Sequence, residues 1–286
     1  MRSFCIITNT DKDRDLTLTN RISEMLTARG CRCTIWQADG KLEGEYHYTD
    51  PSAIPEDTEC ALVLGGDGTL LQAARDLVHE DIPLLGVNMG HLGFLAEVTA
   101  GNVSDAIDRL IEGKFEIEER MMLSGTVYRE GRVQGKNIAL NDVVIARDGH
   151  LRVVRFNNYV NDEFLNSYYA DGIIIATPTG STGYSLSAGG PVVSPRASMI
   201  IMTPVAPHTI NARSVIFAPE DKVTVEIGPG RRGETENALV SFDGDNAFPM
   251  LSGDRVVIQR AAARTRILKL NRLSFVEVLR QKMENT

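Results

Sequence analysis

The chain has 286 residues, 43% of them hydrophobic, and it carries 30 Lys and Arg against 38 Asp and Glu, a formal net charge of -8. A chain of this length buries a large core and is expected to divide into two domains. The excess of acid excludes a general basic face for nucleic acid. Phosphorylated ligands would therefore need local arginines, backbone amides and a divalent cation.

The start of the chain and its apolar segments predict a cytoplasmic protein without a membrane partner. The apolar run in Met1–Ile7 is too short for a signal peptide, and no stretch approaches the roughly 18–20 apolar residues of a membrane helix. The four cysteines lie on or beside expected strands, and the spacing of Cys31 and Cys33 differs from that of a zinc site. We expect all four to be reduced, apolar side chains.

The first third of the chain alternates strand and helix patterns. This alternation is typical of a parallel sheet with helices on both faces, whose ligands bind at the carboxyl ends of the strands. Residues 40–58 are expected to form a loop. The expected strands are Phe4–Asn9, Arg32–Trp36, Cys60–Leu64 and Pro83–Val87, and the expected helices are Asp15–Arg29, Leu70–His79 and Val103–Glu112.

Between the third strand and the next helix the chain reads Gly65-Gly66-Asp67-Gly68-Thr69. Three glycines let backbone amides approach a ligand closely, and a helix N-terminus attracts anions. The turn is thus shaped for phosphate, yet it carries an acid where a P-loop would carry Lys. Asp67 is then a proton acceptor, a metal ligand or both. The alternative is that Asp67 only caps the helix.

From about Glu116 short strands follow one another, which predicts a mainly antiparallel second domain. We expect an α/β domain over residues 1–118, completed by the tail 265–286, and a β-rich domain over residues 119–264. In the tail, Ile267–Leu279 reads as a strand followed by a helix. The strands expected in the second domain are Met121–Tyr128, Asn137–Ala146, Val153–Val160, Asp171–Ala176, Met199–Thr203, Ser214–Phe217, Val223–Ile227, Ala238–Phe242 and Arg255–Arg260.

Two polar segments interrupt this β-rich region. Ala170–Pro191 is dense in glycines and hydroxyls, with Asp171 near one end and Tyr184 offering an aromatic face to a base. It predicts a nucleotide site, against the alternative of a Ser/Thr-rich loop that caps a helix. Asn141 and Asp142 break an otherwise apolar strand, which taken alone favours a turn or an edge pair.

Together these segments resemble the NAD kinase family over almost the whole chain. The first motif alone also occurs in diacylglycerol and sphingosine kinases and is related to that of phosphofructokinases, whereas the hydroxyl-rich block is far more specific. The resemblance rests on Gly65–Thr69, Gly90–Leu95, Asn141-Asp142, Asp171–Pro191, Thr203-Pro204 with Pro207-His208, and Ser241–Gly244.

The resemblance implies transfer of the γ-phosphoryl group of ATP to the 2′-hydroxyl of the adenosine ribose of NAD, giving NADP. It implies Asp67 as the proton acceptor, Mg²⁺ held largely by the ATP phosphates with no protein metal ligand, and a homodimer or homotetramer. The residues that it implies around the dinucleotide are Gly68, Asn141, Asp142, Arg152, Tyr169, Asp171, Thr182, Gly183, Tyr184, Ser185, Leu186, Ser187, Ala206 and Asn246. Among these, Thr182–Ser187 would lie on the adenine side.

The chain departs from the family pattern at three of these positions. Asp142 stands where Glu is commoner, Gly183 where Ala often precedes the tyrosine, and Asn246 where Gln is often found. Two other functions remain open at this level. One is another kinase with the Gly-Gly-Asp-Gly motif, such as a lipid kinase, and the other is a non-catalytic sensor of NAD(H) or NADP(H). The lack of an amphipathic basic segment argues against the first, and retention of Asp67 argues against the second.

Overall fold

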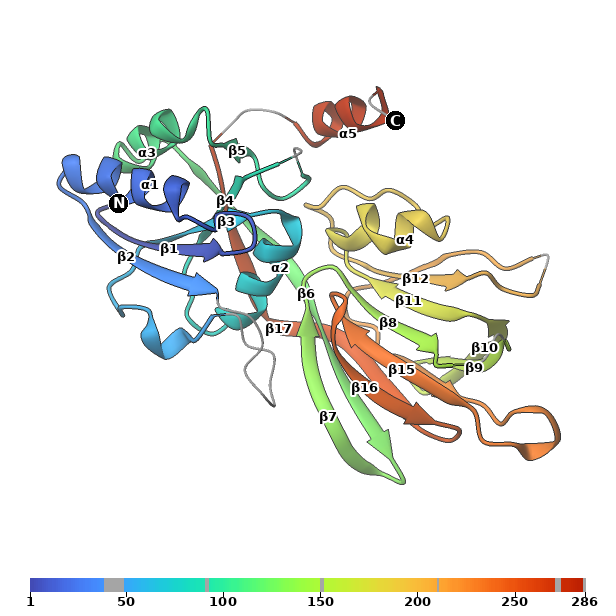
Figure 1. The fold of residues 1–286 in the computed structure, drawn as a ribbon. Helices are drawn as coiled ribbons and strands as arrows, with labels where there is room; N and C mark the ends of the chain where they lie inside the picture. The colour runs from blue at the N-terminus through green and yellow to red at the C-terminus, as the bar shows by residue number, and fades with distance from the viewer. Residues whose placement is uncertain (39–48, 91–92, 150–151, 210, 271–273, 285–286) are drawn as a thin grey trace. The chain divides into compact units, whose positions relative to one another are not determined.

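The computed structural model describes residues 1–38, 49–90, 93–149, 152–209, 211–270 and 274–284. The chain forms two compact units, one of Met1–Arg120 with Arg264–Thr286 and the other of Met121–Ala263 (Figure 1). Residues 40–48 of the expected loop 40–58 lie outside the described residues, and the remainder contains a short turn of 3₁₀ helix, η1 (Pro51–Ala53). No helix among the described residues is both long and apolar enough to cross a membrane.

The first unit is built on a parallel sheet. Its strands lie in the order β2-β1-β3-β4, and β4 also pairs with β5 and with the end of β17 through Leu84 and Ile267. The strands are β1 (Ser3–Asn9), β2 (Arg32–Ala38), β3 (Cys60–Gly65), β4 (Leu84–Asn88), β5 (Val98–Thr99) and β17 (Arg255–Lys269). Apolar runs such as Cys60–Leu64 are buried on both faces, as a parallel sheet between helices requires.

Helices cover both faces of this sheet. Helices α1 (Thr17–Ala28) and α3 (Val103–Ile111) lie side by side on one face, where Leu85 and Val87 join their core (Figure 1). Gly86 therefore faces the other side, because successive residues of a strand alternate. There a Cβ on Gly86 would lie 2.8 Å from Leu70 of α2 (Asp67–Asp76). The predicted parallel sheet with flanking helices is confirmed.

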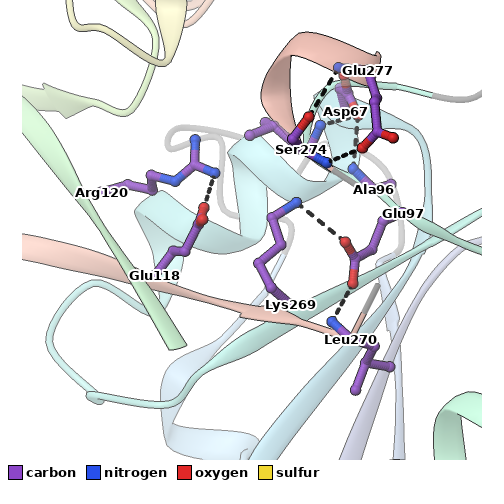
Figure 2. A network of polar contacts seen from close by, with 10 residues as sticks. Asp67, Ala96, Glu97, Glu118, Arg120, Lys269, Leu270, Ser274 and Glu277 are labelled. Atoms are coloured by element: carbon purple, nitrogen blue, oxygen red, sulfur yellow. Dashed lines mark hydrogen bonds and ion pairs between the residues drawn. The ribbon is translucent and has the colours of Figure 1, made fainter. Parts of the chain in front are cut away.

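The tail ends in helix α5 (Phe275–Glu284), which belongs to the first unit. Its start is a capping box, in which Ser274 and Glu277 each accept a hydrogen bond from the other's backbone amide, at 3.2 and 2.7 Å (Figure 2). These bonds also lower the pKa of Glu277. The expected tail strand is the last part of β17.

The second unit packs two antiparallel sheets around one core that includes Ile173, Ile175, Phe156 and Phe242. One sheet has the order β13-β12-β11-β8-β15-β16, and the other contains β10-β9-β14-β17 with β6 and β7. The strands are β6 (Glu116–Arg129), β7 (Arg132–Ala139), β8 (Asp142–Arg147), β9 (Val154–Val160), β10 (Glu163–Ala170), β11 (Gly172–Ala176), β12 (Ile200–Val205), β13 (Val215–Phe217), β14 (Val223–Ile227), β15 (Asn237–Phe242) and β16 (Asp245–Leu251). The predicted antiparallel β-rich part is confirmed.

Two predicted elements have wrong boundaries near the polar motifs. The expected strand Asn137–Ala146 is split into β7 and β8, because the amides of residues 140–142 bond to a side chain instead of a neighbouring strand. Helix α2 begins at Asp67 rather than Leu70, since the Thr69 hydroxyl accepts a hydrogen bond from the amide of Gly66, the N-cap residue, at 3.4 Å. It ends at Asp76, before His79.

Three strands were not predicted from the sequence, and a fourth is longer than expected. Strands β5, β10 and β16 were missed, and β17 continues to Lys269 rather than ending at Arg260. Strand β10 follows β9 through Asn161 and Asp162, both with positive φ, as in a tight hairpin turn. Partner strands supply the hydrogen bonds that hold these polar segments extended.

Candidate active site

The Gly-rich turn lies where the strand order of the first unit reverses. Strand β1 has β2 on one side and β3 on the other, so chain connections diverge between β1 and β3. In open α/β sheets ligands bind at such a point, outside the carboxyl ends of the strands. Strand β3 ends at Gly65 and β1 at Asn9, and Asn9 donates a side-chain hydrogen bond to the Thr69 hydroxyl at 3.2 Å.

The carboxylate of Asp67 points away from its own helix and toward a second loop. It accepts hydrogen bonds from the backbone amides of Phe94 at 2.9 Å, Leu95 at 3.4 Å and Ala96 at 3.2 Å. Gly66, not Asp67, is the N-cap residue of α2, so a capping role does not account for this acid. Because a carboxylate has about four acceptor positions, these bonds orient Asp67 and still leave room for a substrate hydroxyl.

The loop that holds Asp67 is itself anchored. A Cβ on Gly93 would overlap the Asp67 carboxylate, so only glycine permits this approach. The next acid, Glu97, accepts hydrogen bonds from the Leu270 amide and from the Lys269 ammonium, the latter at 3.4 Å (Figure 2). The end of β17 therefore fixes the loop that orients Asp67. His91 and Leu92, which precede this loop, lie outside the described residues.

A lysine that the sequence analysis missed lies against the Gly-rich turn. A Cβ on Gly66 would lie 2.7 Å from the ammonium nitrogen of Lys12. The Lys12 amide donates to the Asn9 carbonyl at 3.1 Å, which holds the loop after β1 at this strand end. No ion pair joins Lys12 to another described residue. Lys12 is distant from the motif in the sequence, so no local pattern signals it.

In the second unit, Asp243 organises the break between β7 and β8. Its carboxylate accepts hydrogen bonds from the amides of Leu140, Asn141 and Asp142 at 2.8, 2.7 and 3.1 Å. On the other side, Thr177 donates its hydroxyl to the Leu140 carbonyl at 2.6 Å and its amide to the Asn141 carbonyl at 2.8 Å. The sequence analysis included Asp243 in the family motif but gave it no role.

The side chains of Asn141 and Asp142, at this break, have few hydrogen-bond partners among the described residues. Burial and the negative charge of Asp243 raise the pKa of Asp142 to about 7. The Asn141 side-chain oxygen is buried without a hydrogen-bond partner among the described residues. A Cβ on Gly183 would lie 3.4 Å from the Asn141 amide nitrogen and 3.8 Å from an Asp142 oxygen. The structure thus brings Asn141, Asp142 and Gly183 together, with polar atoms suited to a polar ligand.

The hydroxyl-rich segment forms η2 (Gly180–Thr182) and α4 (Tyr184–Ser187). Several of its hydroxyls serve the fold, since Ser185 is buried and shares a hydrogen bond with Thr203 at 3.1 Å, and Thr182 donates to the Thr179 carbonyl at 3.3 Å. Tyr184 and Leu186 are 48% and 40% exposed, and Ser187 is also exposed. The open surface of the segment is therefore aromatic and apolar as well as polar.

A second group of expected site residues gathers at the ends of β10 and β12. The His208 amide donates to the Tyr169 carbonyl at 2.7 Å, and the Asp171 amide donates to the Val205 carbonyl, next to Ala206, at 3.0 Å. The Asp171 carboxylate pairs with Arg147 at 2.8 Å.

Three expected site residues make none of these contacts. Arg152 is exposed and pairs with Glu234 at 3.5 Å. Gly68 lies in the first turn of α2, where no atom of the described part of the chain stands within 4 Å of a Cβ position. The side chain of Asn246 lies outside the described residues.

Comparison with known proteins places this geometry in a family. Residues 4–115 match the model of the ATP-NAD kinase N-terminal domain, and residues 140–270 match that of the ATP-NAD kinase C-terminal domain. Proteins named NAD kinase from Lachnoclostridium phytofermentans and Agathobacter rectalis are each 46% identical, over 99% and 100% of this chain and 99% of their own lengths.

Solved structures agree in fold. An NAD kinase from Archaeoglobus fulgidus in complex with ATP has a TM-score of 0.78 at 22% identity, covering 99% of each chain. Yeast NADH kinase complexed with NADH has a TM-score of 0.83 at 22% identity, covering 99% of this chain and 88% of that one. The predicted resemblance is confirmed, and the chain belongs to the NAD kinase family.

Proposed function

We propose that this protein transfers the γ-phosphoryl group of ATP to the 2′-hydroxyl of the adenosine ribose of NAD and so forms NADP. The observation that carries the proposal is the oriented carboxylate of Asp67, which lies at the strand-order reversal and next in the chain to Gly66, the residue that the Lys12 ammonium approaches. Full-length relatives named NAD kinase support the same reaction.

Asp67 acts on the attacking hydroxyl. The transition state of phosphoryl transfer is loose, so little deprotonation is needed early. Asp67 accepts a hydrogen bond from the 2′-hydroxyl, which holds the oxygen in line with the γ-phosphorus. As the new P–O bond forms and the bond to the ADP oxygen breaks, the proton passes to the Asp67 carboxylate. The amides of Phe94–Ala96 keep that carboxylate in place during the transfer.

The phosphate chain is bound by backbone amides and Lys12. Asp67, Gly68 and Thr69 form the first turn of α2, where backbone amides point out of the helix end, and the helix dipole adds positive potential there. No group of three or more His, Cys, Asp and Glu side chains among the described residues is arranged to hold a metal. In the proposal Mg²⁺ is carried by the ATP phosphates and by water. When bound, Mg²⁺ neutralises phosphate charge.

The second unit binds the dinucleotide through Asn141, Asp142 and Gly183, with Thr182–Ser187 on the adenine side. The Asn141 side-chain oxygen, which has no partner among the described residues, and the buried carboxyl of Asp142 support this assignment, because buried polar groups are normally paired. The proposal includes a homodimer or homotetramer, which light scattering on the purified protein tests.

The direct test is NADP formation by the purified protein with NAD, ATP and Mg²⁺. We expect turnover that depends on all three. Binding of NAD without any turnover would leave a sensor, and phosphorylation of dispersed diacylglycerol in place of NAD would show a lipid kinase. Either result would contradict the proposal.

Replacing Lys12 with Met is expected to raise KM for ATP about 10–100-fold, since a charge-assisted hydrogen bond contributes roughly 1.5–3 kcal/mol. The Kd for NAD, measured without ATP, should stay within about twofold. Lys114→Met is the matched control, because Lys114 lies in the same unit and pairs with Glu112 at 2.7 Å on the surface. An unchanged KM for ATP in Lys12→Met would remove Lys12 from the phosphate site.

A further inference from the structure

We infer that Asp243 is a positioning residue that holds Asn141 and Asp142 in the orientation that binds the dinucleotide. The inference rests on the proposed function, in which Asn141 and Asp142 contact NAD. Asp243 itself lies on the turn between β15 and β16 and acts through the backbone of the turn before β8.

The geometry assigns this role because Asp243 replaces a strand partner. At Leu140 and Asn141 the chain passes from β7 of one sheet to β8 of the other, and the amides of Leu140, Asn141 and Asp142 all donate to the one carboxylate. In return the Asp243 amide donates to the Asp142 carbonyl at 3.0 Å. Asp243 has φ of 52°, a left-handed conformation that Asp and Asn tolerate better than most residues. The two turns are therefore locked to each other.

The opposite side of the Asn141–Asp142 turn is closed by Gly180 and Thr177. A Cβ on Gly180 would overlap the Asn141 carbonyl, and Thr177 bonds the carbonyls of Leu140 and Asn141. The backbone of the turn is fixed from both sides, whereas no hydrogen bond or ion pair among the described residues holds the carboxyl of Asp142. Loss of the hydrogen bonds to Asp243 would release one side of this turn, and the side chains of Asn141 and Asp142 could then rotate.

Asp243 also sets the charge at the site. The negative charge of its carboxylate raises the pKa of Asp142. The neighbouring elements place Ala176 of β11 and the backbone of Gly183 next to Asp142, and neither of these groups is charged. An ionised Asp142 accepts hydrogen bonds from ligand hydroxyls more strongly than a protonated one. Affinity for NAD should therefore rise with pH through about 7, the pKa of Asp142 in the presence of Asp243.

The test is Asp243→Asn, which keeps the size and the positive φ but removes the charge. We expect two changes in NAD binding, measured by calorimetry without ATP from pH 5.5 to 8.5. The Kd at the upper end should rise about tenfold, because neutral acceptors hold the turn more weakly, and the midpoint of the pH dependence should move below that of the wild type. KM for ATP should stay unchanged. The matched control is Asp221→Asn, since Asp221 also accepts a loop amide, that of Ala218 at 2.9 Å.

An unmoved midpoint in Asp243→Asn would overturn the inference even if the Kd rises, since a purely structural role changes affinity without changing the titration. If Asp243→Asn does not fold, Asp142→Asn tests the same coupling, and pH dependence near 7 that persists in that variant would overturn the inference. Failure of the wild type to form NADP would instead contradict the proposed function, so the two failures are distinguishable.

Discussion

Asp67→Asn is expected to lower kcat for NADP formation about 10²–10⁴-fold, the usual contribution of a positioned proton acceptor. The Kd for NAD should change less than about twofold, because asparagine keeps the shape of the side chain and one acceptor oxygen for the amides of Phe94–Ala96. The loss arises because an amide cannot take the proton of the attacking hydroxyl. Single-turnover kinetics with saturating NAD and ATP measure the chemical step directly.

The matched control is Asp105→Asn. Asp105 is likewise an acid in the first turn of a helix in the same unit, α3, and it is exposed. A general loss of acidic charge would affect both variants, whereas the proposed role affects only Asp67. A kcat for Asp67→Asn within about threefold of the wild type would refute the assignment of the proton acceptor.

The second large effect is expected for Gly180→Ala. The new methyl group would overlap the backbone of Asn141, and backbone on both sides cannot swing away as a flexible side chain does. Overpacking of this kind costs about 1–3 kcal/mol of unfolding free energy. The displaced Asn141–Asp142 turn should also lower kcat/KM for NAD about 10²-fold, the effect of a misplacement near 1 Å.

Denaturant unfolding measures the expected loss of unfolding free energy, and steady-state kinetics measure the expected fall in kcat/KM for NAD. Gly101→Ala is the control, because the nearest atom to a Cβ there is the Thr99 hydroxyl at 3.8 Å, an ordinary contact. An alanine at 180 that leaves both the stability and kcat/KM unchanged would show that the Asn141–Asp142 turn is not closely packed against η2.

The fold class was predictable because its signals are local. Apolar runs between helical patterns in the first unit, such as Cys60–Leu64, match the elements found, within a few residues at the ends. Strands β10 and β16 escaped because their residues are mixed and partly exposed, and their extended state depends on pairing with β9 and β15. A strand that depends on its neighbour carries little signal of its own.

The family of the chain follows from the amino-acid sequence alone, and the same sequence predicts Asp67 as the central acid, because the Gly-Gly-Asp-Gly turn and the hydroxyl-rich block are continuous motifs. Only the tertiary structure shows what surrounds them. It places the ammonium of Lys12 next to Gly66, in a motif that has no cation of its own. It also shows that the amides of residues 140–142 donate hydrogen bonds to the Asp243 carboxylate. The roles of these residues remain predictions. These contacts join residues that are far apart in the chain, so they depend on strand order and on the packing of turns. A local sequence pattern does not predict them.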